Sequence, residues 1–315
     1  MKNKLTKYCF AFFGAIGTFL AGIVGYQRFI LKKARRKKDE THPMELWETE
    51  QGTIAYRTAG KGRPLVLLHS MMLGASSREW DEVIDALAED YRVYAIDLPG
   101  FGNSFCPEKP WTAYQYAQFL QEFIQTVIKR PVCLCGANGG ADFALIFSLL
   151  HPENVKRMVL VSPEGIARGF ATEEDTKLLS FLLSPVAGTQ KFLLATSRKA
   201  IRQQLETAFY AKEAVSAELV QRYADAARFG EHAQATYAGI ATRFYAADTK
   251  TAFAQLSIPF LMIWGEENKE NPAAAFDTAE KLKDFGAFAL FEHTGALPHL
   301  ENPQAFIDNT KEFLK

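Results

Sequence analysis

The sequence predicts an α/β protein that has a doubly wound, mostly parallel sheet, an inserted helical segment and an N-terminal transmembrane helix. Short apolar runs alternate with longer helical patterns, strand-like runs are missing between about residues 168 and 250, and residues 8–26 carry no charge. These observations divide the chain into a membrane anchor with a basic collar (1–40), a first core part (41–167), a helical cap (168–250) and a last core part (251–315).

The composition excludes several classes of protein. The chain has 315 residues, is 48% hydrophobic and 23% charged, and holds 36 basic and 36 acidic side chains. Such a composition rules out a disordered or fibrous chain. Ten basic but only two acidic side chains lie in residues 1–40, which leaves 26 basic and 34 acidic side chains in the body. A mildly acidic body argues against nucleic-acid binding, since phosphate contacts need a basic face.

Residues 8–26 form the predicted membrane anchor. At 1.5 Å per residue, these 19 residues make a helix of roughly 28 Å, close to the ~30 Å hydrocarbon core of a bilayer. A cleaved signal peptide and a buried core helix are the alternatives, but a basic stretch follows the apolar run and no clear Ala-x-Ala cleavage motif does. The lipid bilayer is therefore the expected partner of this segment.

The basic side chains around this segment predict its orientation. Three lie before it and seven after it, so the positive-inside rule places the C-terminal body of a single-pass protein in the cytoplasm. Cysteine usage agrees, because Cys133 and Cys135 alternate along a predicted strand and only Cys106 lies in a loop-like region of the body. The spacing of the cysteines predicts neither a disulfide framework nor a metal site.

Seven strands and five helices are predicted in the core. Runs such as LVLL, RMVLV and FLMIW are apolar throughout, as in parallel strands that are covered on both faces. In chain order we expect strands at 53–58, 64–68, 92–97, 132–135, 156–161, 260–264 and 288–291. We expect helices at 80–88, 113–128, 139–150, 272–283 and 303–314. This alternation indicates βαβ units and hence a doubly wound sheet.

Residues 168–250 interrupt the alternation and are predicted to be helical. The segment is rich in aliphatic and aromatic residues, including the run LLSFLLSPV at 178–186. Helices inserted over the carboxyl edge of a parallel sheet would cover the crevice where such folds bind ligands. Packing of the cap onto the core is the simpler explanation for most of these apolar side chains.

Five motifs follow one another between about residues 50 and 315. They are LLHSMMLGASSREW (67–80), DLPGFGNS (97–104), CGANGG (135–140), WGEENKENP (264–272) and TGALPHLENPQAF (294–306). In this order and at this spacing they resemble the motifs of the capped α/β hydrolases. The resemblance implies an α/β-hydrolase fold for the whole body of the chain.

The resemblance also implies three positions for a Ser-His-Asp triad, and all three are replaced. The family's nucleophile elbow, G-x-S-x-G, has Asn138 at the serine position here. The position of the acid matches Asn268, and that of the histidine matches Ala296. A carboxamide has no ionisable nucleophilic oxygen, and neither asparagine nor alanine can act as the carboxylate or the base. The fold is therefore expected to serve a purpose other than Ser-His-Asp hydrolysis.

The alternative interpretation of these replacements is a catalytic site that is built from other residues. Ser70 is a candidate for a displaced nucleophile, Glu164 follows a predicted strand at the carboxyl edge, and His299 lies near the start of the last helix. Each also has an ordinary structural explanation. The oxyanion loop is expected at Ser70, Met71 and Gly139. No cofactor and no metal are expected.

Two functions remain open from the sequence. The first is a membrane-anchored, catalytically degenerate protein that binds an apolar small molecule, a lipid or a protein partner under its cap. The second is a membrane-bound ester or lipid hydrolase with a non-standard site built from some of Ser70, Glu164 and His299. Clustering of these three side chains within hydrogen-bond reach would favour the second function, and scattering would favour the first.

Overall fold

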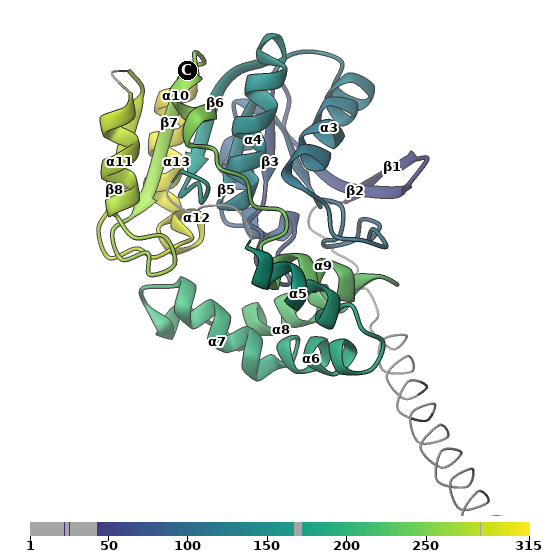
Figure 1. Ribbon diagram of the computed structural model, residues 1–315. Helices are drawn as coiled ribbons and strands as arrows, with labels where there is room; N and C mark the ends of the chain where they lie inside the picture. Colours follow the sequence, from purple (N-terminus) through teal and green to yellow (C-terminus); the bar gives the residue numbers. More distant parts are fainter. Residues whose placement is uncertain (1–21, 23–24, 26–42, 167–171, 284) are drawn as a thin grey trace, which may run out of the picture.

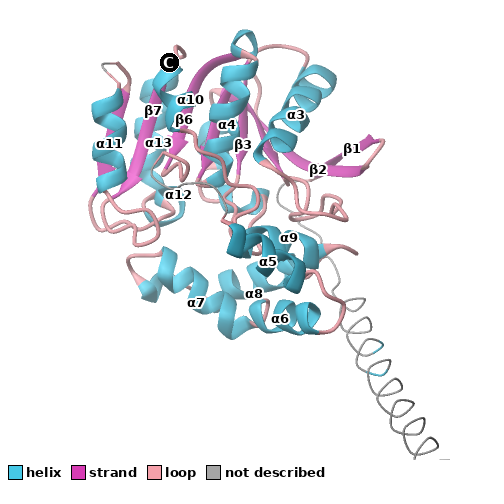
Figure 2. Cartoon of the chain, in the orientation of Figure 1, coloured by secondary structure: helices cyan, strands magenta, loops and turns pink. Residues whose placement is uncertain are grey.

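The computed structural model describes residues 22, 25, 43–166, 172–283 and 285–315. One eight-stranded sheet forms the centre, helices cover both of its faces, and a further group of helices lies across one end of the strands (Figure 1). Figure 2 shows the same arrangement with strands in magenta and helices in cyan. This is the α/β architecture that the sequence predicts.

The sheet has the strand order β1-β2-β4-β3-β5-β6-β7-β8. Its strands are β1 Met44–Thr49, β2 Gly52–Ala59, β3 Arg63–Leu68, β4 Tyr91–Ile96, β5 Val132–Ala137, β6 Val155–Val161, β7 Phe260–Gly265 and β8 Ala287–Phe291. β1 pairs with β2 and β2 with β4 in antiparallel register, and all other pairs are parallel. The seven predicted strands correspond to β2–β8, and β1 is an edge strand that the sequence analysis missed.

The sheet buries apolar side chains on both faces. In β3, Leu65 and Leu67 belong to one apolar cluster, whereas Val66 and Leu68 belong to the other. The first cluster includes residues of α2 (Ile84–Ala88) and α13 (Pro303–Leu314), and the second includes residues of α3 (Ala113–Phe123), α4 (Gly139–Leu150), α10 (Lys250–Gln255) and α11 (Ala274–Leu282). Burial on both faces explains why these strands read as continuous apolar runs.

The core helices follow the predicted ranges with two differences. The predictions at 139–150 and 303–314 coincide with α4 and α13. The helix predicted at 113–128 is divided, because α3 ends at Phe123 and Ile124–Ile128 forms a π-helical turn. Of the helix predicted at 80–88, only α2 is α-helical, and a short 3-10 helix, Ser77–Trp80, precedes it. A second 3-10 turn, Pro152–Asn154, leads into β6.

Five helices are described between β6 and α10, where the structure describes residues 162–166 and 172–249. They are α5 Glu173–Leu182, α6 Ala187–Ala195, α7 Arg198–Ala208, α8 Ala217–Ala227 and α9 Ala233–Ala241, with a 3-10 turn at Lys212–Ala214. In Figure 1 they form a layer below the lower ends of the strands. Gly74, which has φ +87, lies against the backbone of Tyr223 in α8 so closely that no side chain would fit. The inserted helices thus pack directly onto the loop that follows β3.

The predicted membrane anchor lies outside the described residues, apart from Gly22 and Gly25. In the ranges that the structure describes, no single helix is both long and apolar enough to cross a bilayer. Helices α5 and α6, which meet at 94°, have the necessary length and composition only when they are taken as a pair.

Candidate functional site

Asn138 occupies a sharp turn between β5 and α4. Its backbone has φ 51° and ψ −120°, and its N–H donates to the carbonyl oxygen of Val161 at 2.8 Å. A Cβ on Gly136 would lie 2.5 Å from the carbonyl oxygen of Gly140, so the helix packs tightly on the strand that precedes it. The backbone therefore has the strained strand-to-helix shape of a nucleophile elbow, and it carries a buried asparagine at the apex.

Asn268 lies in the loop after β7. Its Oδ1 accepts hydrogen bonds from the backbone N–H groups of Glu270 (3.1 Å) and Asn271 (2.9 Å). Among the described residues, its buried Nδ2 has no hydrogen-bond partner. The side chain therefore holds its own turn and supplies no negative charge to the site.

Ala296 lies in the loop after β8, under the end of α7. It is 1% exposed, and its N–H donates to the carbonyl oxygen of Ala208 at 2.7 Å. Glu301 strengthens this junction by accepting hydrogen bonds from Tyr210 N–H (2.7 Å) and Gly295 N–H (2.8 Å). The position that the resemblance assigns to the catalytic histidine is thus a methyl group packed beneath the inserted helices.

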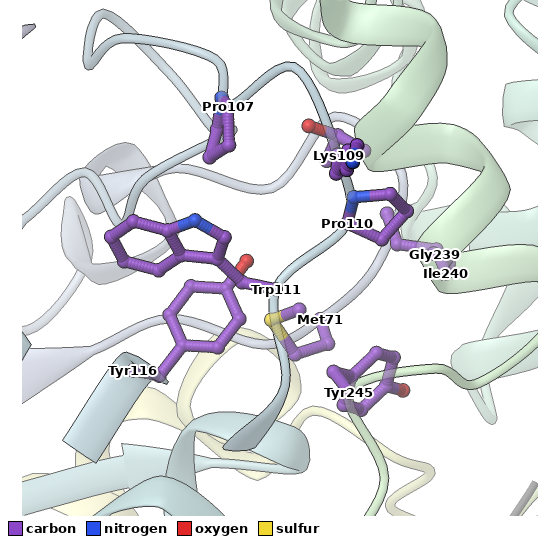
Figure 3. A pocket seen from close by; sticks show the side chains of 10 residues that line it. Met71, Pro107, Lys109, Pro110, Trp111, Tyr116, Gly239, Ile240 and Tyr245 are labelled. Carbon is purple, nitrogen blue, oxygen red and sulfur yellow. The ribbon is translucent and has the colours of Figure 1, made fainter. Parts of the chain in front are cut away.

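The space above the elbow is nearly filled by side chains. A Cβ on Gly139 would lie 2.5 Å from Cγ of Met71 and 2.9 Å from Cε2 of Tyr245. The cavity that these two residues help to line measures only about 10 Å³, and Figure 3 shows Trp111 and Tyr116 on its other side. An open hollow of about 560 Å³ adjoins this small cavity, with which it shares Pro107, Lys109, Pro110 and Trp111, and another of about 440 Å³ lies elsewhere on the molecule. A substrate-sized space at the elbow is therefore closed in this conformation.

Glu79 joins two of the three candidates for a relocated site. Ser70 donates its hydroxyl to Oε2 of Glu79 at 2.8 Å and its N–H to Oε1 at 3.1 Å, while Nε2 of His299 lies 3.0 Å from Oε1. All three residues are buried. The carboxylate stands between the hydroxyl and the imidazole, whereas a nucleophilic relay needs the imidazole in the middle. The N–H of Ser70, expected in the oxyanion loop, already has Glu79 as its acceptor.

The surroundings of Glu79 couple the core to the inserted helices. Tyr223 in α8 donates its hydroxyl to Oε2 at 3.3 Å, and the ring of Trp80 stacks on His299 with 4.3 Å between centroids. Burial on its own raises the pKa of Glu79, but His299, His69 and Ser70 together outweigh burial through their hydrogen bonds and charge, and the pKa is lowered. Glu79 is not among the residues predicted from the sequence, where its only signal is an acidic residue beside a tryptophan in the motif at 67–80.

Glu164 belongs to a second network on the other side of the elbow. The hydroxyl of Tyr245 donates to Oε2 of Glu164 at 3.2 Å, and the guanidinium of Arg243 lies 4.0 Å from the same oxygen. In the same network, burial and then the charge of Glu164 raise the pKa of Asp142 to about 8. No hydrogen bond or ion pair between described residues joins Glu164 to Ser70 or His299. The three candidates therefore form two separate groups.

His69, in the loop after β3, has a structural role. His69 accepts a hydrogen bond from the N–H of Leu98 at 3.1 Å through Nε2, which leaves Nδ1 to donate to the carbonyl oxygen of Ser70 at 2.7 Å. Burial lowers the pKa of His69 and favours its neutral form. In the described ranges, no group of three or more His, Cys, Asp or Glu side chains could hold a metal ion.

The chain is similar in sequence to known hydrolytic enzymes. The chain is 27% identical over 265 residues to a pimeloyl-[acyl-carrier protein] methyl ester esterase from Aeromonas hydrophila, a match that covers 83% of this chain and 99% of the relative. It is 34% identical over 142 residues to a 2-hydroxy-6-oxo-6-(2'-aminophenyl)hexa-2,4-dienoic acid hydrolase from Metapseudomonas resinovorans, covering 44% and 49% of the two chains.

Solved structures share the fold. A serine hydrolase involved in carbazole degradation superposes with a TM-score of 0.72 at 22% identity, covering 87% of this chain and 99% of the other. A membrane phospholipase A superposes with a TM-score of 0.68 at 21% identity, covering 100% and 98%. A family model described as alpha/beta hydrolase fold matches residues 63–303. This match spans most of the chain, which therefore belongs to the α/β hydrolase fold family.

Proposed function

We propose that this chain is a membrane-anchored, catalytically degenerate member of its family that binds an apolar small molecule, a lipid or a protein partner at its inserted helices, which act as a cap. The observation that carries the proposal is the elbow itself. Its backbone keeps the family shape, yet Asn138, Asn268 and Ala296 supply no nucleophile, no acid and no base. A scaffold of this shape can still position a ligand without cleaving it.

An acyl chain or a lipid is the ligand class that we favour. The relative from Aeromonas hydrophila is named for an acyl ester, and one structural neighbour is described as a membrane phospholipase A. Met71, Trp111, Ile240 and Tyr245 make the lining of the small cavity mainly apolar, and Lys109 and Thr236 also line it. The unbranched side chain of Met71 can change rotamer at low cost, so its displacement would open the cavity toward Gly139.

The membrane part of the proposal rests on the sequence. Residues 8–26 are uncharged and long enough to span a bilayer, and the basic residues that follow favour a cytoplasmic body. Leu178, Phe181 and Leu183 at α5 and Leu194 in α6 expose between 38% and 58% of their surface. Apolar side chains grouped on neighbouring helices fit a protein that works beside a lipid surface.

Titration with a fluorescent fatty acid tests the binding proposal. We expect saturable binding of the fatty acid to the full chain, and no release of the acid from its methyl ester when the ester is offered instead. Ile240→Trp, which fills the cavity, should weaken binding, whereas Leu290→Trp on the exposed surface of β8 should leave it unchanged. The proposal would be contradicted if no fluorescent fatty acid of any chain length bound saturably, or if both variants lost binding to the same extent.

A relocated hydrolase site is the second candidate, and the shared contacts of Ser70 and His299 with Glu79 favour it. The order of the three groups weakens it, because His299 lies on the far side of the carboxylate from the hydroxyl. If this candidate holds, Ser70→Ala and His299→Ala should each abolish ester turnover by the full chain, and an inactive parent protein would exclude it.

A further inference from the structure

Asn138 and Gly139 form the only Asn-Gly dipeptide in the sequence, and they stand at the elbow. We propose that Asn138 is a site of self-modification, at which the folded chain converts its own asparagine to aspartate through a cyclic imide with the backbone nitrogen of Gly139. The inference goes beyond ligand binding and depends on none of the roles proposed above. It rests on the backbone angle, the freedom of the amide and the position of the attacking nitrogen.

The backbone angle at Asn138 brings the reacting groups onto one side. Viewed along the Cα–C bond of an L-residue, the Cα–Cβ bond is rotated by a third of a turn from the bond between Cα and the residue's own nitrogen, because Cα is tetrahedral. At ψ −120° this rotation places Cβ almost eclipsed with the nitrogen of Gly139. A five-membered imide needs this eclipsed arrangement, since Cβ, Cα, C and N all lie in its ring. The strained elbow therefore holds the ring-forming geometry that helices and strands exclude.

The carboxamide of Asn138 is free to turn its carbon toward that nitrogen. Asn138 is only 3% exposed, yet its Oδ1 has no hydrogen-bond partner among the described residues. A buried amide oxygen is normally bonded, and such a bond would hold the side chain in one rotamer. The fold therefore fixes the backbone of Asn138, but no hydrogen bond to Oδ1 from a described residue restrains its side chain.

The attacking nitrogen also has a suitable position. Gly139 is the first residue of α4, a helix of 12 residues, so its N–H has no acceptor within the helix. The positive end of the helix dipole favours the anion that forms when this N–H loses its proton. Gly139 adds no side chain to the crowded space between Met71 and Tyr245. The cavity of about 10 Å³ beside these residues can hold roughly one water molecule.

The reaction balances with water as its only co-reactant. Hydroxide removes the proton from the Gly139 nitrogen, the nitrogen bonds to Cγ of Asn138, and the Cγ–Nδ2 bond breaks with release of ammonia. Water then adds to one imide carbonyl. Addition at Cγ gives aspartate, and addition at the main-chain carbonyl gives isoaspartate. The formal charge of the chain changes from zero to minus one, and the elbow gains a carboxylate that the sequence does not encode.

Peptide mapping in ¹⁸O-labelled water tests the proposal on the full chain in detergent. We expect residue 138 to lose its amide and take up ¹⁸O, together with an acidic shift on isoelectric focusing. The rate in the folded protein should exceed the rate at the same residue in urea several-fold, because only the fold imposes ψ −120°. Asn103, which precedes a serine, is the internal reference for ordinary deamidation.

Asn138→Gln is the matched variant, because a six-membered imide closes far more slowly. It should lose the labelled product and the acidic shift. If that variant does not fold, the comparison of folded and unfolded parent protein still decides the matter. A slower reaction in the folded state than in urea, or ¹⁸O uptake no faster at residue 138 than at Asn103, would overturn the proposal.

Discussion

At Asn138 the backbone retains the family turn while the side chain supplies no nucleophile. The motifs alone assign Asn138, Asn268 and Ala296 to the three triad positions, since each residue follows a recognisable strand in the sequence. Glu79 could not be predicted in the same way. Its partners His299 and Tyr223 lie 220 and 144 positions away along the chain, so only the folded structure brings them together.

Glu79→Gln should lower the free energy of unfolding at neutral pH by about 2 kcal/mol, the value of hydrogen bonds to a charged group. Although burial acts to raise it, the pKa of Glu79 lies below its usual 4.5, because His299, His69 and Ser70 together favour the carboxylate. The stabilisation is therefore complete above about 4.5 and disappears as the pH falls through the lower folded-state pKa. Urea unfolding across this range measures the effect, with exposed Glu82→Gln as control. A difference that persists unchanged in strong acid would contradict this account.

Asp142→Asn should stabilise the protein, and the gain should grow with pH. The pKa of Asp142 is raised to about 8 from 3.8, mainly by burial, so the folded state keeps a proton that the unfolded state releases. The parent protein then loses up to about 1.4 kcal/mol of stability per pH unit between those values, and the variant does not. Thermal unfolding at several pH values tests this. An equal gain at pH 4 and pH 8 would show that burial of the charge is not the cause.

At the scale of elements, the sequence predicts the strands β2–β8 but not the edge strand β1. That edge strand has no fully buried residue, includes Glu45 and Glu48, and leaves Leu46 55% exposed. A pattern search for continuous apolar runs cannot detect such a strand. Composition likewise predicted that residues 168–250 are helical, but only packing shows that α7 covers Ala296 and that Tyr245 lies against Gly139.

Glu301→Ala should loosen the inserted helices. Glu301 is the acceptor for the N–H groups of Tyr210 and Gly295, and its loss removes these two hydrogen bonds, each worth about 1 kcal/mol. Hydrogen–deuterium exchange should become faster around Tyr210 and Gly295. The exposed residue Glu312, also near the C-terminus, provides the control variant Glu312→Ala. If exchange at both sites stays at the parent level, Glu301 does not hold this junction.

At the scale of the whole molecule, the zero formal charge conceals two different parts. The predicted anchor region is strongly basic, whereas the body carries an excess of eight acidic side chains. Hydropathy and charge support the predicted anchor and orientation, and both stay predictions because residues 8–26 lie outside the described residues apart from Gly22 and Gly25. The state of the cavity depends on tertiary packing and could not be predicted from the same data.

The full chain should remain with membranes after a high-salt wash, and the fragment 41–315 should be soluble without detergent. The apolar segment 8–26 is expected to provide the hydrophobic anchoring, and the net charge of the body is expected to favour solubility. Sedimentation of membrane fractions followed by size-exclusion chromatography of the fragment tests both statements. Release of the intact full chain by salt would exclude the anchor.

The measurement that tests the central claim most directly is reaction of the full chain in detergent with a fluorophosphonate probe, followed by mass-spectrometric mapping of labelled residues. Because Asn138 offers no nucleophilic oxygen, Ala296 offers no base and the hydroxyl of Ser70 is bound to Glu79, we predict no stoichiometric labelling of any serine. Stoichiometric labelling of one serine would contradict the proposal of a catalytically degenerate protein if replacement of that serine with alanine abolished both the labelling and ester turnover. That result would show that the protein is a hydrolase.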